Sequence, residues 1–250
     1  KSIRPKGMIA GGRRTTEGIF SALTSFQNPL GKTIAKTKLQ SYSYTSIIDI
    51  LSKNNYDSAF FQGTSKETSG TGSLAQKLGF KKSYGKRDIN KRIYEENYWG
   101  VHDPDLYNFA IETTKKLKEP FVLGINGATT HDQLLPKSVK KKNYVLDEEK
   151  NNKLNALSFA DAALEKYITY MEEKYPNTIF ILFADHTSGR IIQDTFSKYL
   201  IPFAIYSKNL EARFYNSFIS QRDISPTVLH LMGMEQPEEM TGSVLMQLTK

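Results

Sequence analysis

The stretch TIFILFAD, residues 178–185, is followed at once by His186. Its apolar side chains lack the strict alternation of a strand with one face in water, which predicts a strand buried on both faces. Such a strand normally ends in turn residues, but this one ends in a carboxylate and an imidazole, which suit a Zn²⁺- or Mn²⁺-like ion. The stretch therefore predicts a buried strand with a candidate metal site at its carboxyl end.

Three further apolar runs have the same character, at residues 57–63, 120–127 and 201–207. Helical patterns at 45–55, 103–119 and 154–175 separate the runs, and one face of the third pattern carries Leu157, Ala160, Leu164, Tyr167, Ile168 and Met171. This order predicts an α/β fold with a doubly wound, mostly parallel sheet and helices on both faces. We find no repeat or linker, so we expect a single domain over residues 1–250.

The composition narrows the function classes. With 39% hydrophobic residues the chain can build a core, and with no cysteine it can form neither disulfides nor thiolate metal sites. The formal charge of +8 favours anionic partners. The lysines are scattered apart from a cluster at 137–144, and no interleaving of aromatic and basic residues indicates a nucleic-acid groove. A plain solvated basic surface is the simpler interpretation.

A candidate nucleophile lies in GGRRTTEGIFSAL, residues 11–23. Thr15 follows Arg13 and Arg14 and opens an apolar helical pattern, so its hydroxyl would lie among the free N–H groups of a helix N-terminus, where anions are favoured. The alternative is a plain N-cap role for Thr15 or Thr16.

Three of the four histidines fall in loops near the predicted strand ends or helix starts. His131 comes just after the 120–127 run and His186 just after 178–185, and the carboxyl ends of such strands meet at one edge of a sheet. His102 precedes a helix that we expect Asp103 to cap. Trp99 lies three residues before His102, so this loop is either a turn with an aromatic anchor or a wall of an active site.

The motifs taken together are more specific than any one alone. In order they are GGRRTTEG (11–18), SLAQKLGFKKSYGKRD (73–88), WGVHDPDLY (99–107), PFVLGINGATTH (120–131), FADH (183–186), IPFAIYS (201–207) and RDISPTVLHLMG (222–233). This order resembles the lipoteichoic acid synthase and phosphoglycerol transferase group of the alkaline phosphatase-like (sulfatase-type) superfamily, over nearly the whole chain.

The resemblance implies a function and a set of site residues. It implies a metal-dependent phosphoglycerol transferase or phosphodiesterase acting on anionic phospholipid or glycan-phosphate substrates. Thr15 would be the nucleophile and a metal ligand, with Asp185 and His186 as the other metal ligands. Arg14, His102 and His131 would bind substrate, and His131 would also act as a catalytic acid and base. The expected ion is Mn²⁺, with Zn²⁺ or Mg²⁺ as alternatives. Sulfatase chemistry is not expected, because the C/S-x-P-x-R motif is not found around Thr15.

The sequence departs from the group in two places. Where the synthases supply a His, a Trp and an Arg, this chain has Gln62, Ser69 and Thr71, so the donor or acceptor could differ. The group also has a first strand that ends in an acidic metal ligand, whereas the 14 residues before Thr15 contain no acid and no strand pattern. Glu17 could replace that acid, but an acid at this position is more often a cap partner.

We therefore expect a chain truncated at its N-terminus that lacks the first strand and could be inactive by itself. The whole protein would be anchored through the missing region at the extracytoplasmic face of a bacterial membrane. Two other functions stay open: a degenerate, non-catalytic member of the superfamily that binds anionic envelope polymers, and a phosphomonoesterase.

Overall fold

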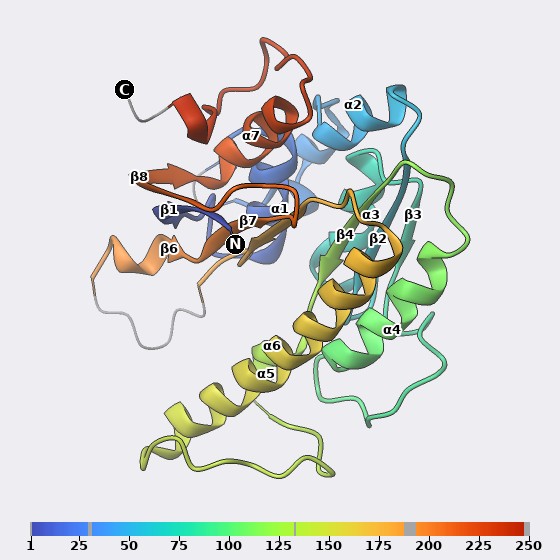
Figure 1. The fold of residues 1–250 in the computed structure, drawn as a ribbon, viewed down its shortest axis with the longest axis vertical. Coiled ribbons are helices and arrows are strands. Elements are labelled where there is room, and N and C mark those ends of the chain that lie inside the picture. Colours follow the sequence, from blue (N-terminus) through green and yellow to red (C-terminus); the bar gives the residue numbers. More distant parts are fainter. Residues whose placement is uncertain (1, 30–31, 133, 188–193, 248–250) are drawn as a thin grey trace. The chain divides into compact units, whose positions relative to one another are not determined.

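A computed structural model describes residues 2–29, 32–132, 134–187 and 194–247. The chain divides into two compact units, which we treat separately. Unit 1 comprises Lys1–Asn55, Ser69–Gly79 and Asn177–Lys250, and unit 2 comprises Tyr56–Thr68 and Phe80–Pro176. Each unit combines a sheet with helices, which confirms the predicted α/β class (Figure 1). The assignment of residues 1–250 to one domain stays a prediction.

Unit 1 contains a mixed five-stranded sheet in the order β5-β7-β1-β6, with β8 also paired to β1. Its strands are β1 (Ile3–Ile9), β5 (Phe180–Phe183), β6 (Leu200–Ile201), β7 (Phe203–Tyr206) and β8 (Arg213–Ser220). Strand β8 runs parallel to β1, but β6 and β7 run antiparallel to it and β5 runs antiparallel to β7. The expectation of a mostly parallel sheet is therefore wrong for this unit. Neighbouring strands run parallel only when a crossover connects them, and no α-helix is described between β5 and β7.

Strand β1 corrects a second expectation, because the first 14 residues were predicted to hold no strand. Pro5 and Gly7 are unusual strand residues, and Arg4 and Lys6 interrupt the apolar pattern. The register against β8 shifts between Pro5 and Gly7. This shift lets both Ile3 and Met8 point into the same core, although their separation of five residues would place them on opposite faces of a regular strand.

The helices of unit 1 are α1 (Thr15–Thr24), α2 (Ile47–Lys53), α3 (Thr71–Lys77) and α7 (Ile224–Leu231). Its short 3₁₀ turns are η1 (Ile34–Lys36), η2 (Lys38–Ser41), η4 (Ser197–Tyr199), η5 (Gln221–Asp223) and η6 (Leu245–Gln247). Helices α1 and α7 contact each other, and Ala22 and Ile224 join one core cluster with buried residues of the sheet. Ser46 caps α2 by accepting the N–H of Asp49 on its hydroxyl.

Unit 2 contains a three-stranded sheet in the order β3-β2-β4, and both pairings are parallel as predicted. Its elements are β2 (Asp57–Gln62), η3 (Thr68–Gly70, which runs into unit 1), β3 (Lys82–Tyr84), α4 (Asp103–Thr114), β4 (Phe121–Asn126), α5 (Thr129–Asp132) and α6 (Glu148–Lys174). Helix α4 contacts both β2 and α6.

Helix α6 is six residues longer at its start than the predicted pattern, which began at residue 154. Tyr167 and Met171 are buried as expected, but Leu157, on the same predicted face, is 45% exposed. Figure 1 shows why: the N-terminal part of α6 extends beyond the strands of its own unit, where no sheet lies beneath it. Within the described ranges, no helix has the length and apolar character to cross a lipid bilayer.

Two isoleucines of unit 2 test this division into core and surface. Ile89 is 1% exposed and Ile93 is 70% exposed. We expect Ile89→Ala to lower the free energy of unfolding by about 2–5 kcal/mol, because it leaves a cavity. The matched variant Ile93→Ala should change it by less than about 0.5 kcal/mol. Urea unfolding followed by the fluorescence of Trp99, in the same unit, measures both, and equal effects would contradict the assignment.

Candidate functional site

Thr15 occupies the first helical position of α1. The residue before it, Arg14, is the N-cap, with an extended backbone (φ −135°, ψ 149°) and no side-chain cap bond. Thr16 bonds through its hydroxyl to that of Thr33 at 2.6 Å, so neither threonine caps the helix. The half-buried Thr15 hydroxyl makes no hydrogen bond to any residue that the structure describes. It is therefore available to a ligand at a helix N-terminus.

Glu17 acts as the cap partner that its position suggested. Its buried carboxylate accepts the backbone N–H of Arg13 at 2.7 Å, which turns the acid toward the backbone. The side chains of Arg13 and Arg14 are exposed beside Thr15. The first turn thus presents two cations and a free hydroxyl, an arrangement suited to a phosphate group.

Gln221 connects the Thr15 segment to the end of β5. Its fully buried side-chain oxygen accepts the N–H of Gly11 at 2.5 Å. Its side-chain nitrogen donates to the carbonyl oxygens of Ala184 and Asp185, at 3.0 and 2.8 Å. One amide therefore holds the loop before α1 and the carboxyl end of β5 together.

Helix α1 also contacts the end of β5 directly. A Cβ atom at Gly18 would overlap the carbonyl oxygen of Asp185, so only glycine allows the first turn of α1 to pack this closely. The structure thus brings the start of the Thr15 helix and the Asp185–His186 pair to one place within unit 1.

The Asp185–His186 pair has the geometry of two ligands to one ion. His186 Nδ1 lies 2.7 Å from the carbonyl oxygen of Thr187, which fixes the tautomer with its proton on Nδ1 and leaves Nε2 as an acceptor. His186 Nε2 and Asp185 Oδ2 lie 3.6 Å apart, and both side chains are about one-quarter exposed. When two atoms each bind one cation at about 2.0–2.2 Å, the distance between the two atoms is close to that between His186 Nε2 and Asp185 Oδ2. The pair therefore fits a divalent metal.

The described residues supply only part of such a site. They contain no group of three or more His, Cys, Asp or Glu side chains arranged for a metal. The hydroxyl of Thr15 is the candidate third ligand. One carboxylate oxygen of Glu17 accepts the N–H of Arg13, which fixes that side chain without excluding it as a ligand.

In unit 2, His131 lies on the short helix α5 that follows β4. Its exposed ring contacts Trp99, with ring centroids 3.9 Å apart. Asp103 holds this segment in place: its Oδ1 accepts the N–H groups of Ala128 and Thr129 at 2.8 and 3.1 Å. Thr129 in return accepts the N–H of Asp103 at 2.8 Å. The contact between Trp99 and His131 agrees with the aromatic anchor expected in this loop, and the active-site wall stays a prediction.

Asp103 was predicted to cap α4, but the N-cap is His102, and the Asp103 side chain binds the α5 segment instead. His102 is 1% exposed and contacts the rings of Tyr94 and Phe159. Its Nδ1 has no hydrogen-bond partner among the described residues. Burial lowers the pKa of His102, and the nearby Asp103, Asp105 and Glu95 only partly oppose this. This burial argues against direct contact with a substrate.

The three residues at the sequence departure belong to different units. Gln62 lies at the end of β2 in unit 2, fully buried, and its side-chain nitrogen bonds Thr64 and the carbonyl of Ser65. Ser69 and Thr71 belong to unit 1, and Thr71 is buried at the start of α3. Gln62 thus holds the turn that follows β2, and Thr71 packs at the start of α3.

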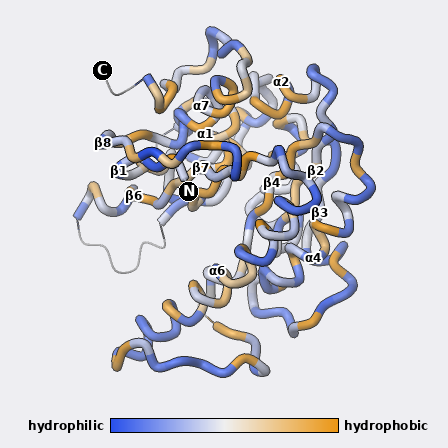
Figure 2. The backbone as a smooth tube through the Cα atoms, viewed as in Figure 1, coloured by the Kyte–Doolittle hydropathy of each residue, from blue (hydrophilic) through white to orange (hydrophobic). Residues whose placement is uncertain are grey.

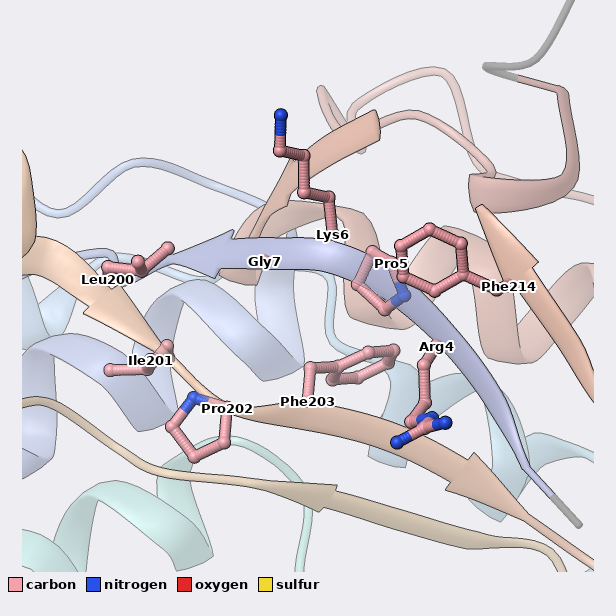
Figure 3. Close-up of a pocket in the computed structure, with 9 residues that line it drawn as sticks. All are labelled: Arg4, Pro5, Lys6, Gly7, Leu200, Ile201, Pro202, Phe203 and Phe214. Atoms are coloured by element: carbon pink, nitrogen blue, oxygen red, sulfur yellow. The ribbon is translucent and has the colours of Figure 1, made fainter. Parts of the chain in front are cut away.

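An open groove of about 540 Å³ lies on the sheet of unit 1, away from these residues. Its lining comes from β1, β6, β7 and β8, and Figure 3 shows Phe214 beside Pro5, with Lys6 pointing away from the strands. None of the predicted site residues lines this groove.

Sequence reasoning missed Gln221, which bonds the end of β5 in unit 1, and it missed the pairing of Asp103 with Thr129, which holds the His131 segment in unit 2. Gln221 follows β8, a strand that the sequence pattern did not predict, so nothing placed it at a strand end. Asp103 and Thr129 lie within the motifs of His102 and His131, but their pairing across 26 residues has no local signal.

Comparisons with known proteins agree with this architecture. The sequence model of the sulfatase family matches residues 2–234. The lipoteichoic acid synthase-like protein YvgJ of Bacillus subtilis is 19% identical and matches 89% of this chain, which spans only 40% of that relative.

Two solved structures share the fold. The lipoteichoic acid synthase LtaP of Listeria monocytogenes aligns with a TM-score of 0.83 and 19% identity, covering 100% of this chain and 68% of its own. The Streptococcus pyogenes phosphoglycerol transferase GacH, in complex with sn-glycerol-1-phosphate, aligns with a TM-score of 0.65 and 18% identity, covering 90% of this chain and 63% of its own.

Replacement of Gln221 tests the connection between Gly11 and β5. Gln221→Ala leaves the Gly11 N–H and two carbonyl oxygens without partners, so we expect the free energy of unfolding to fall by at least about 2 kcal/mol. Gln236 is the control, because it is exposed and also donates to two carbonyl oxygens. Gln236→Ala should cost less than about 1 kcal/mol. Urea unfolding followed by circular dichroism compares them, and a mild effect of Gln221→Ala would show that the amide is dispensable.

The pH dependence of stability tests the burial of His102. The pKa of His102 is lower in the folded protein than in the unfolded chain. Below about pH 6.5 the unfolded chain therefore binds a proton at this histidine that the folded protein does not bind. Stability should therefore decrease from pH 7.5 to pH 5.5, and His102→Gln should reduce this decrease. His230→Gln, which replaces an exposed histidine, is the control, and His102→Gln should reduce the decrease more than this control does. Unfolding followed by Trp99 fluorescence measures the free energy of unfolding at each pH. If that free energy depends on pH in His102→Gln as it does in the original chain, the prediction is contradicted.

Proposed function

We propose that this chain, which belongs to the sulfatase family, is the catalytic part of a phosphotransferase or phosphodiesterase that uses Thr15 as its nucleophile. The observation that carries the proposal is the packing of the start of α1 against the end of β5. Gly18 of α1 packs against the carbonyl group of Asp185, and Gln221 donates to that same carbonyl, so the helix that begins at Thr15 contacts the Asp185–His186 pair. In this proposal the Thr15 hydroxyl, the two arginines before it and the Asp185–His186 pair together bind one phosphate group.

Thr15 would attack the phosphorus of a phosphodiester in line. A bond forms between its Oγ1 and phosphorus, the bond from phosphorus to the leaving alkoxide breaks, and the hydroxyl proton goes to solvent. The free N–H groups of the first turn of α1 and the exposed Arg13 and Arg14 would offset the charge of the phosphate. An acceptor hydroxyl or water then displaces the threonine.

Asp185 and His186 would hold the divalent ion, with Thr15 as a third ligand. When bound, such an ion lowers the pKa of a hydroxyl and polarises a phosphoryl oxygen. We propose Mn²⁺ first, with Zn²⁺ or Mg²⁺ as alternatives, because a carboxylate and an imidazole bind all of these ions.

His131 is the proposed acid and base. It would protonate the leaving alkoxide and later take a proton from the acceptor. Its exposed ring contacts Trp99, and the Asp103–Thr129 pair holds the segment that carries it, which supports this role. His102, which is buried, would act by holding the loop before α4.

The substrate class we propose is a lipid- or glycan-linked phosphoglycerol diester. The structural likeness to the synthase LtaP and to GacH, which was solved with sn-glycerol-1-phosphate, supports this choice, as does the net charge of +8. We further propose that the protein acts at the extracytoplasmic face of a bacterial membrane.

A second candidate function is a non-catalytic member that binds anionic envelope polymers. The lack of a third acidic or imidazole ligand among the described residues favours it. It predicts no uptake of Mn²⁺ and salt-sensitive binding to an anionic polymer.

Replacement of Thr15 tests the catalytic proposal. With Mn²⁺ present, we expect hydrolysis of bis-(4-nitrophenyl) phosphate, and Thr15→Ala should lower kcat by at least about a thousandfold because no nucleophile remains. Thr15→Ser keeps a hydroxyl and should stay within about tenfold of the original. Full activity in Thr15→Ala would remove this residue from the mechanism.

Metal binding gives a control that does not depend on turnover. EDTA should abolish the activity and Mn²⁺ should restore it, while calorimetric titration should show weaker Mn²⁺ binding to Asp185→Asn and His186→Gln. If neither the chain nor these variants bind Mn²⁺, the non-catalytic alternative is favoured. Release of free phosphate from a phosphomonoester as the main reaction would instead indicate a phosphomonoesterase.

A further inference from the structure

The segment between α5 and α6 presents a second feature that the proposed chemistry does not use. We call residues 137–147 the lysine loop, and its last apolar residues, Tyr144, Val145 and Leu146, the tip. In Figure 1 the loop lies beside the part of α6 that extends beyond the strands of unit 2. Figure 2 shows a mostly hydrophilic loop with a hydrophobic stretch where it joins α6.

Side-chain amides of α6 hold the lysine loop in a defined conformation. Asn155, which is 4% exposed, accepts the N–H of Lys142 and donates to its carbonyl, both at 2.8 Å. Asn151 accepts the N–H of Tyr144 at 2.8 Å. The backbone of the loop is therefore fixed against the helix, while the side chains from residue 140 onward are exposed.

The tip exposes three consecutive apolar side chains. Leu146 is fully exposed, and Tyr144 and Val145 are 44% and 42% exposed. An apolar group of this kind at the end of an extension, surrounded by polar residues, indicates a surface that binds something apolar.

Lysines lie immediately beside the tip. Residues 137–142 contain four of them, Lys137, Lys140, Lys141 and Lys142, and no acid. Lys141 contacts Asn152 and Lys137 pairs loosely with Glu95, and all four side chains are exposed.

Three acids, Asp147, Glu148 and Glu149, begin α6. Asp147 accepts the N–H of Lys150 at 2.8 Å and caps the helix, and Glu148 and Glu149 lie in its first turn, where the helix end favours acids. The lysines keep their charge available to an anionic partner.

We propose that the tip and the lysine loop dock the protein on an anionic lipid bilayer. The tip enters the boundary between head groups and acyl chains, and the lysines contact the phosphates. A nucleic acid offers no apolar phase for Val145 and Leu146. A second copy of the chain would bring two lysine clusters together, which like-charge repulsion disfavours. This docking is independent of the proposed catalysis.

Vesicle sedimentation tests the docking, with Thr15→Ala as the background so that turnover does not interfere. We expect binding to vesicles of equal phosphatidylglycerol and phosphatidylcholine, and little binding to phosphatidylcholine alone. The double variant Val145→Ser/Leu146→Ser should bind at least about tenfold more weakly, since two apolar side chains no longer enter the bilayer. Lys140→Gln/Lys141→Gln/Lys142→Gln should lose the preference for the anionic lipid, and 0.5 M NaCl should weaken binding of the original chain.

Ile93→Ser is the matched control, because Ile93 is an exposed apolar residue of the same unit outside the lysine loop. It should bind vesicles like the original chain, and circular dichroism should show that every variant is folded. Equal vesicle binding by the tip variant and the Ile93 control would overturn the proposal. So would a concentration-dependent dimer that the tip variant abolishes, because it would show that the tip binds a second copy.

Discussion

The buried side-chain amide of Gln221 holds the architecture of unit 1 around the candidate site. It accepts one N–H from the loop that follows β1 and donates to two carbonyl groups at the end of β5. An amide can serve both roles at once because it carries a donor and an acceptor, which neither a hydroxyl at this reach nor a carboxylate provides in the same way. The positions of Thr15 and Asp185 both follow from these three bonds.

In unit 2, hydrogen bonds of buried side chains hold the segment that carries His131. Asp103 and Thr129 exchange hydrogen bonds across two elements and so define the path of the chain between β4 and α5. In both units the side chains with candidate chemistry lie on short segments after a strand, and buried polar residues from distant parts of the sequence hold those segments. Such groups are costly to leave unpaired, so they specify the loop geometry strongly.

Much of the local structure could be predicted from the sequence. The apolar runs at 57–63 and 120–127 became β2 and β4, and the pattern after Thr15 became α1. The failures have physical causes. Strand β1 carries charges, a proline and a glycine, and it is a strand because it pairs on both sides, an interaction that no local pattern reports. Leu157 follows the helical period but has no sheet beneath it, so periodicity alone could not predict its exposure.

The sequence by itself determined the α/β class, the ends of the parallel strands of unit 2, and which residue types stand at the end of β5 and the start of α1. These features depend on hydrophobic periodicity and on neighbours within a few residues. Only the tertiary structure decided the direction of β6 and β7 and the burial of His102. It also decided that the helix of Thr15 lies against Asp185, because that contact joins residues about 170 positions apart through packing and buried hydrogen bonds.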